Sequence, residues 1–182
     1  MWPITMPWKN MGLAISAYNI VLTHNLYTEL IMVLEFHRFS RTDRGFNSLI
    51  VTNGGVGQDT AVGVIPQFEP CRMLWDTGAQ TSCVTSRMVN LLGLKPVGKA
   101  TFQDYSGNRE SLIYKVTFCL PDNLIVSGVP VSESFDNQQY DVILGLDIIS
   151  HGDFHLTGQG GDRTLSFCYP SIEKLTFEGE VN

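Results

Sequence analysis

The clearest pattern along the chain is an alternation between positions 112 and 120. Every second position carries a large apolar side chain, and these residues are Leu112, Tyr114, Val116, Phe118 and Leu120. A period of two predicts a β-strand with one face toward a core, because successive side chains of a strand point to opposite faces. Ser106, Gly107 and Asn108 precede the series and are typical of a turn. The strand is therefore predicted to follow the tip of a hairpin.

Shorter apolar runs, separated by turn residues, predict further strands. Residues 46–52 are predicted to form a strand that ends in a turn at the glycine-rich segment 53–57. Residues 61–65 and 71–75 are predicted to form a hairpin around the proline-containing segment between them.

The last part of the chain repeats this arrangement. Residues 154–156 and 164–167 flank a segment that contains three glycines, and they predict another hairpin. Residues 142–144 are a separate short apolar run between Asp141 and Gly145.

Helical signals are short. Thr85 or Ser86 is predicted to cap a helix that ends at Gly93, and its apolar face consists of Met88, Leu91 and Leu92. Residues 146–150 predict one helical turn that stops before Gly152. Near the N-terminus, the spacing of apolar residues 27–34 fits a helix that Asn25 caps and that ends at His37 and Arg38, although residues 20–22 suit a strand equally well.

Composition supports a folded, mostly β chain. The 182 residues include 17 glycines and 8 prolines, and 43% of the residues are hydrophobic, which is enough for a core. A polar break at residues 41–44 separates two parts. We predict an N-terminal extension of unknown role at 1–44 and a compact domain at 45–182.

Charge and cysteine spacing exclude several classes of protein. The net charge of -6, without a basic run, argues against nucleic-acid binding. The four cysteines are widely spaced and include no Cys-x-x-Cys pair, so they predict buried thiols instead of a zinc site or a disulfide framework. No secretory signal is recognisable, and polar residues interrupt the apolar segment 11–36, so a cytoplasmic location is expected and a membrane span is not.

Asp76 is the candidate for chemistry. The apolar residues Met73, Leu74 and Trp75 lead directly to Asp76, and Thr77, Gly78 and Ala79 follow it. A carboxylate at the end of a buried strand is costly unless it is paired or hydrogen-bonded. The structural alternative is an aspartate that caps its own turn through neighbouring backbone amides.

An ordered series of motifs decides between these interpretations. The series consists of residues 74–79, then 82–85, then 91–94, and finally 142–149 with the sequence Val-Ile-Leu-Gly-Leu-Asp-Ile-Ile. It resembles the retropepsin family, in which an apolar pair precedes Asp-Thr-Gly-Ala and a later Ile-Leu-Gly strand precedes a short helix. It is most similar to bacterial retropepsin-like proteins, and the resemblance covers roughly residues 46–177.

The resemblance implies a partly closed β-barrel with one or two short helices and an aspartic endopeptidase activity. Asp76 would be the catalytic carboxylate, Thr77 would link two active-site loops, Gly78 would allow close backbone approach, and Ala79 would keep the site uncrowded. The chain has one Asp-Thr-Gly, so the second carboxylate must come from a second copy in a homodimer that acts on a polypeptide substrate. Asp147 matches a structural position of the family.

The resemblance also places a mobile flap at the hairpin tip, which comprises Tyr105, Ser106, Gly107 and Asn108. An ordinary exposed turn is an equally good interpretation of these residues. No cofactor and no metal is expected, because His151 and His155 lack the glutamate of a His-Glu-x-x-His motif and have Gly152 between them.

Two alternatives to a freely soluble enzyme stay open at this point. One is a catalytically silent retropepsin-like module that dimerises or binds peptides, since a fold does not guarantee an activity. The other is a membrane-anchored peptidase with residues 11–36 as its anchor.

Overall fold

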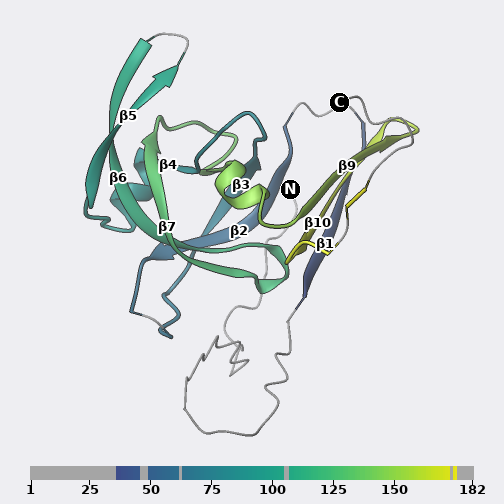
Figure 1. Ribbon diagram of the computed structural model, residues 1–182, viewed down its shortest axis with the longest axis horizontal. Helices are drawn as coiled ribbons and strands as arrows, with labels where there is room; N and C mark the ends of the chain where they lie inside the picture. The colour runs from purple at the N-terminus through teal and green to yellow at the C-terminus, as the bar shows by residue number, and fades with distance from the viewer. Residues whose placement is uncertain (1–35, 46–48, 62, 105–106, 173, 176–182) are drawn as a thin grey trace, which may run out of the picture.

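Two β-sheets make up most of the computed structural model, which describes residues 36–45, 49–61, 63–104, 107–172 and 174–175 (Figure 1). The larger sheet has the strand order β2-β3-β8-β4-β7-β6-β5, and a further pairing of β2 with β6 closes six of its strands into a barrel. The smaller sheet has the order β1-β10-β9.

The elements in chain order are β1 (His37–Asp43), β2 (Val51–Gln58), β3 (Glu69–Trp75), β4 (Cys83–Thr85), α1 (Ser86–Leu91), β5 (Gly98–Asp104), β6 (Gly107–Cys119), the 3₁₀ turn η2 (Pro121–Asn123), β7 (Ile125–Ser134), β8 (Val142–Leu144), α2 (Leu146–Ile149), β9 (Asp153–Gln159) and β10 (Asp162–Tyr169).

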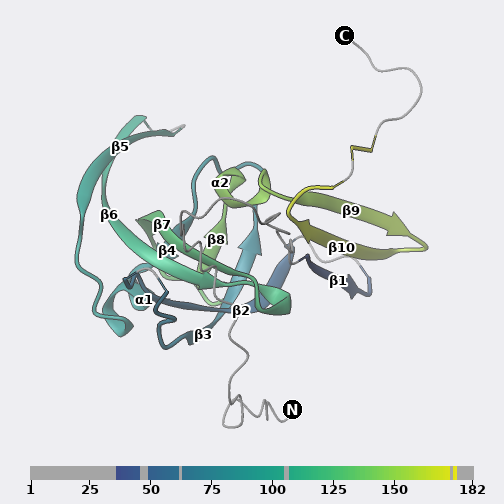
Figure 2. The ribbon, with the colours of Figure 1, turned by 60° about the horizontal axis from the view of Figure 1, so that its bottom comes forward.

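Strand β6 is the longest of these strands, and its alternation is the one that the sequence predicts. Tyr114, Val116 and Phe118 are at most 3% exposed and point into the barrel. The strand pairs with β5 along its first half and with β7 and β2 along its second half. It therefore connects the barrel wall to a projecting hairpin. Figure 2 shows that hairpin and the three-stranded sheet on opposite sides of the barrel.

An aromatic cluster joins the small sheet to the barrel. The ring of Trp75, at the end of β3, lies 5.0 Å from Phe167, 5.7 Å from Phe39 and 5.9 Å from Phe154, measured between ring centroids. The indole nitrogen of Trp75 also donates a hydrogen bond of 2.9 Å to Thr52 Oγ1. These contacts fix the end of the strand that leads into Asp76.

The prediction of a turn at residues 53–57 is wrong, because these residues lie in the middle of β2. Their glycines serve close packing. A Cβ atom on Gly54 would lie 2.5 Å from Met73 Sδ, and one on Gly57 would lie 2.8 Å from the carbonyl oxygen of Gln67. The strand passes so close to its neighbours that side chains do not fit, and strand pairing overrides the local turn preference.

The predicted hairpin between residues 61–65 and 71–75 is also wrong in its first strand. The antiparallel partner of β3 is β2, and the register runs from Val51 opposite Leu74 to Val56 opposite Glu69. Residues 59–61 and 63–68 belong to the connection between the two strands.

The prediction of an N-terminal helix is wrong at its C-terminal end. His37 and Arg38 belong to strand β1, which pairs with β10 over its whole length. The rest of that predicted helix lies outside the described residues. Strand β1 comes from the segment 1–44 that we expected to be an extension, so the end of this segment contributes a strand to the fold.

Both short helices and both later hairpins are confirmed. Helix α1 begins after Thr85 and is followed by Gly93 at a φ of 60°, and α2 follows Gly145. Strands β5 and β6 form one hairpin, and β9 and β10 form the other. In the described part of the chain, neither helix is long and apolar enough to cross a membrane.

Candidate active site

Asp76 is the first residue after β3, and backbone hydrogen bonds fix it in place. Strand β3 runs parallel to β8, with Trp75 opposite Leu144, and the backbone N–H of Asp76 donates to the Leu144 oxygen at 3.0 Å. The chain then turns, because Gly78 N–H donates to Asp76 Oδ1 at 2.9 Å and Ala79 N–H donates to the Asp76 carbonyl at 3.2 Å. The side chain is half-buried, with its carboxylate at the surface of a fixed loop.

The start of α2 holds the other end of this loop, residues 76–82. The backbone N–H of Leu146 donates to the Ala79 oxygen at 2.8 Å, and that of Asp147 donates to the Gln80 oxygen at 3.2 Å. Gly145 sits so close that a Cβ atom on it would lie 2.7 Å from the Thr81 carbonyl carbon. The loop and the start of the helix are therefore packed backbone against backbone.

A buried serine and Asp147 complete the attachment. Ser82 is fully buried, and the Asp147 carboxylate accepts hydrogen bonds from both its N–H, at 2.9 Å, and its hydroxyl, at 2.7 Å. The same hydroxyl oxygen accepts from Gly145 N–H at 3.0 Å. The structural interpretation of Asp147 is thus confirmed. The contribution of Ser82 was not recognisable in the sequence, since its partner lies 65 residues away.

Comparison with known proteins finds similarities among solved structures. No family model and no curated protein matches the chain. A retropepsin-like aspartic protease from Rickettsia conorii is similar with 11% identity and a TM-score of 0.46, over 74% of this chain and 96% of that one. EIAV protease in complex with an inhibitor is similar with 21% identity and a TM-score of 0.42, over 59% of this chain and 91% of that one. Simian foamy virus (mac) protease is similar with 15% identity and a TM-score of 0.37, over 54% and 92% of the two chains.

The described fold is mostly β, with a barrel of six strands and two short helices. This is the fold class that the order of the motifs led us to expect. The similar structures have identities of 11–21% and TM-scores below 0.5, so the activity has to be argued from the residues of this chain.

The hairpin β5–β6 contains the residues at which the sequence analysis expected a flap. Its strands pair from Gly98 opposite Ile113 to Asp104 opposite Gly107. Tyr105 and Ser106 at the tip lie outside the described residues, whereas Gly107 and Asn108 begin β6. The pairing with β7 starts only at Ile113, so in the described pairings the outer half of the hairpin is bonded to itself alone.

Cys83 lies just beyond the Asp76 loop and is a core residue, as the sequence indicated. Its side chain is buried in β4, and burial is the main reason why the pKa of its thiol is raised. The negative charges of Asp76 and Asp147 raise that pKa further, against hydrogen bonds that lower it. A thiol that stays protonated at neutral pH is a poor nucleophile.

The described residues contain no group of three or more His, Cys, Asp or Glu side chains that is placed to hold a metal ion. His151 lies in the turn after α2, and His155 lies on β9. The helical spacing that would bring two imidazoles onto one metal is therefore not present.

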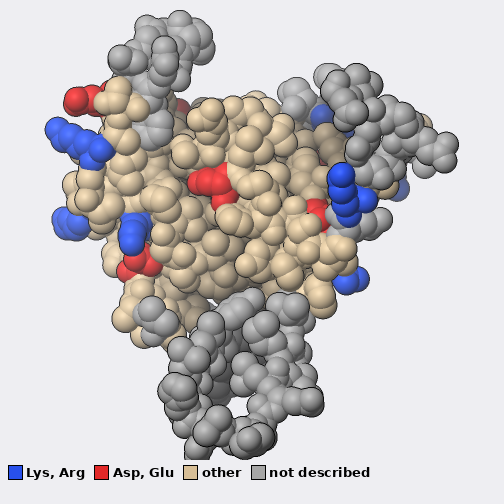
Figure 3. All heavy atoms as spheres, viewed as in Figure 1, with Lys and Arg blue, Asp and Glu red and all other residues tan. Residues whose placement is uncertain are grey.

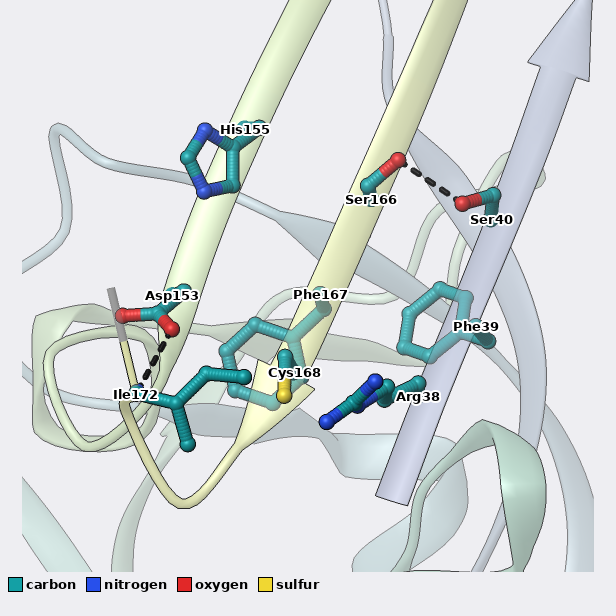
Figure 4. Close-up of a pocket in the computed structure, with 9 residues that line it drawn as sticks. All are labelled: Arg38, Phe39, Ser40, Asp153, His155, Ser166, Phe167, Cys168 and Ile172. Carbon is teal, nitrogen blue, oxygen red and sulfur yellow. Dashed lines mark hydrogen bonds between the residues drawn. The ribbon is translucent and has the colours of Figure 1, made fainter. Parts of the chain in front are cut away.

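A cavity of about 340 Å³ lies away from Asp76, on the small sheet. Its lining comprises Arg38, Phe39, Ser40, Asp153, His155, Ser166, Phe167, Cys168 and Ile172 (Figure 4). Asp153 accepts hydrogen bonds from the Ser171 hydroxyl and, at 2.7 Å, from Ile172 N–H. Its carboxylate therefore holds the C-terminal segment against β9, and this cavity includes no residue of the Asp76 loop.

Proposed function

We propose that the chain is an aspartic endopeptidase whose active site forms when Asp76 of two copies meet. The observation that carries this proposal is the position of Asp76, a half-buried carboxylate on a loop that backbone hydrogen bonds fix from both sides. A catalytic group must be held in a fixed position relative to the bound substrate, and these hydrogen bonds hold Asp76 in this way.

Two aspartates in the segment from β8 to α2 are already engaged. Asp147 is bound by Ser82. Asp141 pairs with Arg87 and also accepts a hydrogen bond of 2.9 Å from Arg72 N–H. Neither is free to serve as the partner of Asp76, which supports a second copy of the chain as the source of the second acid.

Two carboxylates at hydrogen-bonding distance cannot both ionise, so the pair shares one proton. The ionised member accepts a proton from a water molecule, which attacks the scissile carbonyl carbon. The protonated member donates its proton toward the carbonyl oxygen. The tetrahedral intermediate then collapses as its C–N bond breaks. The peptide nitrogen takes the proton that the first carboxylate accepted from water, and the second carboxylate recovers a proton from one hydroxyl of the intermediate. No covalent bond to the protein is formed in this scheme.

The loop residues take supporting roles in this proposal. Thr77 is exposed and would link the two loops across the two-fold axis, while Gly78 and Ala79 would leave space for the substrate backbone. The hairpin that carries Tyr105, Ser106, Gly107 and Asn108 would act as a lid that covers the substrate and excludes water.

Cleavage of a peptide library by the wild type and by Asp76→Asn tests the proposal. Asparagine keeps the size of the side chain but cannot share the proton, so we expect cleavage to fall by at least about 10³-fold while the circular-dichroism spectrum stays unchanged. Wild-type activity should decline on both sides of its pH optimum, because the dyad is inactive when it is doubly protonated or doubly ionised.

Chelators should leave wild-type cleavage unchanged, because no step involves a metal ion. An Asp76→Asn variant that cleaves as fast as the wild type would contradict the assignment. So would an inactive wild type together with an unfolded Asp76→Asn variant, because Asp76 would then be a structural turn residue.

A further inference from the structure

The outer face of the small sheet carries polar side chains at regular positions. The rings of Phe39 and Phe167 contact Trp75 on the barrel side, and successive side chains of a strand point to opposite faces. The residues on either side of each phenylalanine therefore face away from the barrel. The cavity of about 340 Å³ lies over this outer face (Figure 4). The strand register places its polar residues in two rows across the sheet, Arg38-Cys168-Asp153 and Ser40-Ser166-His155.

The guanidinium group of Arg38 has no acidic partner. Arg38 is exposed, and in the described part of the chain its side chain forms no ion pair. The guanidinium carbon lies 5.3 Å from the centre of the Phe36 ring. This contact leaves the N–H groups of the guanidinium available, and their planar arrangement matches the oxygens of a carboxylate or a phosphate. Figure 4 shows the guanidinium pointing toward Cys168, on the neighbouring strand.

The second row supplies further hydrogen-bond donors. Ser40 and Ser166 share one hydrogen bond of 2.8 Å, which uses only one of their two hydroxyl hydrogens. His155 lies opposite Ser166 in the strand register, and its ring has no hydrogen bond to any described residue. A neutral imidazole has one N–H donor, and a protonated imidazole has two. An oxygen atom above this row can therefore accept hydrogen bonds from either strand.

The acidic groups near this cavity already accept hydrogen bonds. The two carboxylate oxygens of Asp153 accept from the Ser171 hydroxyl and from Ile172 N–H. Asp122, in the turn η2, accepts from the backbone N–H of Arg38 at 2.9 Å. Although the net charge of the chain is -6, Figure 3 shows Lys and Arg side chains on the side of the molecule that carries the small sheet. The unused donors and the guanidinium together favour an anionic ligand.

We propose that this cavity binds a small organic anion. Its carboxylate or phosphate group is held by the Arg38 guanidinium and the hydroxyl pair of Ser40 and Ser166. Its apolar part lies against Ile172, which is 52% exposed at the edge of the cavity. A volume of about 340 Å³ is within the range of small-molecule sites. The cavity includes no residue of the Asp76 loop, so this proposal does not depend on the proposed peptidase activity.

Titration of the full chain with phenylacetate and with phenyl phosphate tests the proposal. Backbone amide chemical shifts, measured by NMR, give both the dissociation constant and the position of the bound probe. At least one probe should bind with a Kd of about 1 mM or tighter, as is ordinary for a ligand of this size, and should shift signals of β1, β9 and β10. The probe that binds more tightly identifies the anionic group. Phenylacetamide is uncharged and should bind at least about 10-fold more weakly than that probe.

Substitutions of two arginines on β1 separate the cavity from a general effect of charge. Arg38→Gln should weaken binding of the tighter probe by at least about 10-fold, because it removes the guanidinium. Arg38→Lys keeps the charge without the planar donors, so it should weaken binding by about threefold. Arg41→Gln removes the same charge from the same strand, but Arg41 points to the opposite face and pairs with Asp43. Its dissociation constant should stay within about twofold of the wild type.

Several results would overturn the proposal. One is that neither probe binds the wild type at about 10 mM, which is too weak for a specific site. Another is that the shifted signals all lie outside the small sheet. Equal weakening by Arg38→Gln and Arg41→Gln would show that the probes respond only to the overall charge. If phenylacetamide binds as tightly as the anions, the cavity selects apolar groups and the assignment of an anion is wrong.

Discussion

The loop at residues 76–82 and the hairpin β5–β6 are attached to the barrel in opposite ways. The loop donates a backbone hydrogen bond to Leu144 and accepts backbone hydrogen bonds from Leu146 and Asp147. A buried side-chain network between Ser82 and Asp147 holds it in addition. The outer half of the hairpin, by contrast, has strand partners only within itself among the described pairings. A segment with many long-range contacts opens only with the global fold, whereas a segment with few can open locally.

This difference matches what the proposed mechanism asks of each region. A carboxylate that shares a proton with its counterpart must be held within a fraction of an ångström, and the loop has the contacts to do so. A lid must move to admit and release substrate, and a hairpin with few attachments can do this at low cost. Substitutions of equal size in the two regions should therefore have very different consequences.

A matched pair of glycine substitutions should give the largest contrast. A Cβ atom on Gly145 would lie 2.7 Å from the Thr81 carbonyl carbon and 2.9 Å from the Ala79 oxygen, so Gly145→Ala must displace the loop backbone. The φ of Gly145 is -92°, which any residue adopts, so the cost is steric and not conformational. We expect the free energy of unfolding to fall by about 3 kcal/mol. Peptide cleavage should also be lost, because the loop that carries Asp76 is displaced.

Gly98, at the base of the hairpin, provides the control. A Cβ atom there would meet nothing within 4 Å, so Gly98→Ala should change the free energy of unfolding by less than about 1 kcal/mol. Urea denaturation measures the free energy of unfolding of both variants. If Gly145→Ala and Gly98→Ala were equally stable, the loop would not be packed more tightly than the base of the hairpin.

Removal of the Asp147 carboxylate should have the next largest effect. Asp147→Ala leaves the buried N–H and hydroxyl of Ser82 without their acceptor, which should cost about 2 kcal/mol in the free energy of unfolding and lower kcat. Asp147→Asn keeps one oxygen that accepts from Ser82 N–H, and its amide can donate to the serine oxygen, so it should lose less than half as much. If the alanine variant matches the wild type in both stability and kcat, Asp147 does not position the loop.

Local signals in the sequence were sufficient for much of the site. The apolar run that ends at Asp76 is a buried strand, and the run at residues 142–144 lies beside it and leads into the short helix α2. These predictions held because strand alternation, apolar runs and helix-ending glycines act over a few neighbouring residues.

The errors arose where distant segments decide the structure. Gly54 looks like a turn residue until Met73 and Cys119, from two other strands, are known to press against it. His37 and Arg38 form a strand because β10, more than 120 residues later, offers an edge to pair with. The role of Ser82 depends on Asp147 in the same way. Information of this kind is not contained in any short window of the sequence.

Shortening the hairpin should have the smallest effect on stability and a clear effect on activity. Thr101 and Glu110 are paired across β5 and β6, so residues 102–109 can be replaced by a two-residue Asn-Gly turn that suits a hairpin. The removed part has strand partners only within the hairpin among the described pairings, so the free energy of unfolding should change by less than about 1 kcal/mol. If the hairpin is a lid, kcat/KM for peptides should fall by at least about 100-fold, because the substrate is no longer covered and water is no longer excluded. Sedimentation of the shortened variant shows whether it still forms a dimer. This measurement separates the loss of the lid from the loss of the dimer. Undiminished cleavage by a folded, dimeric variant would show that the hairpin is an ordinary turn, and the contrast between loop and hairpin would then concern stability alone.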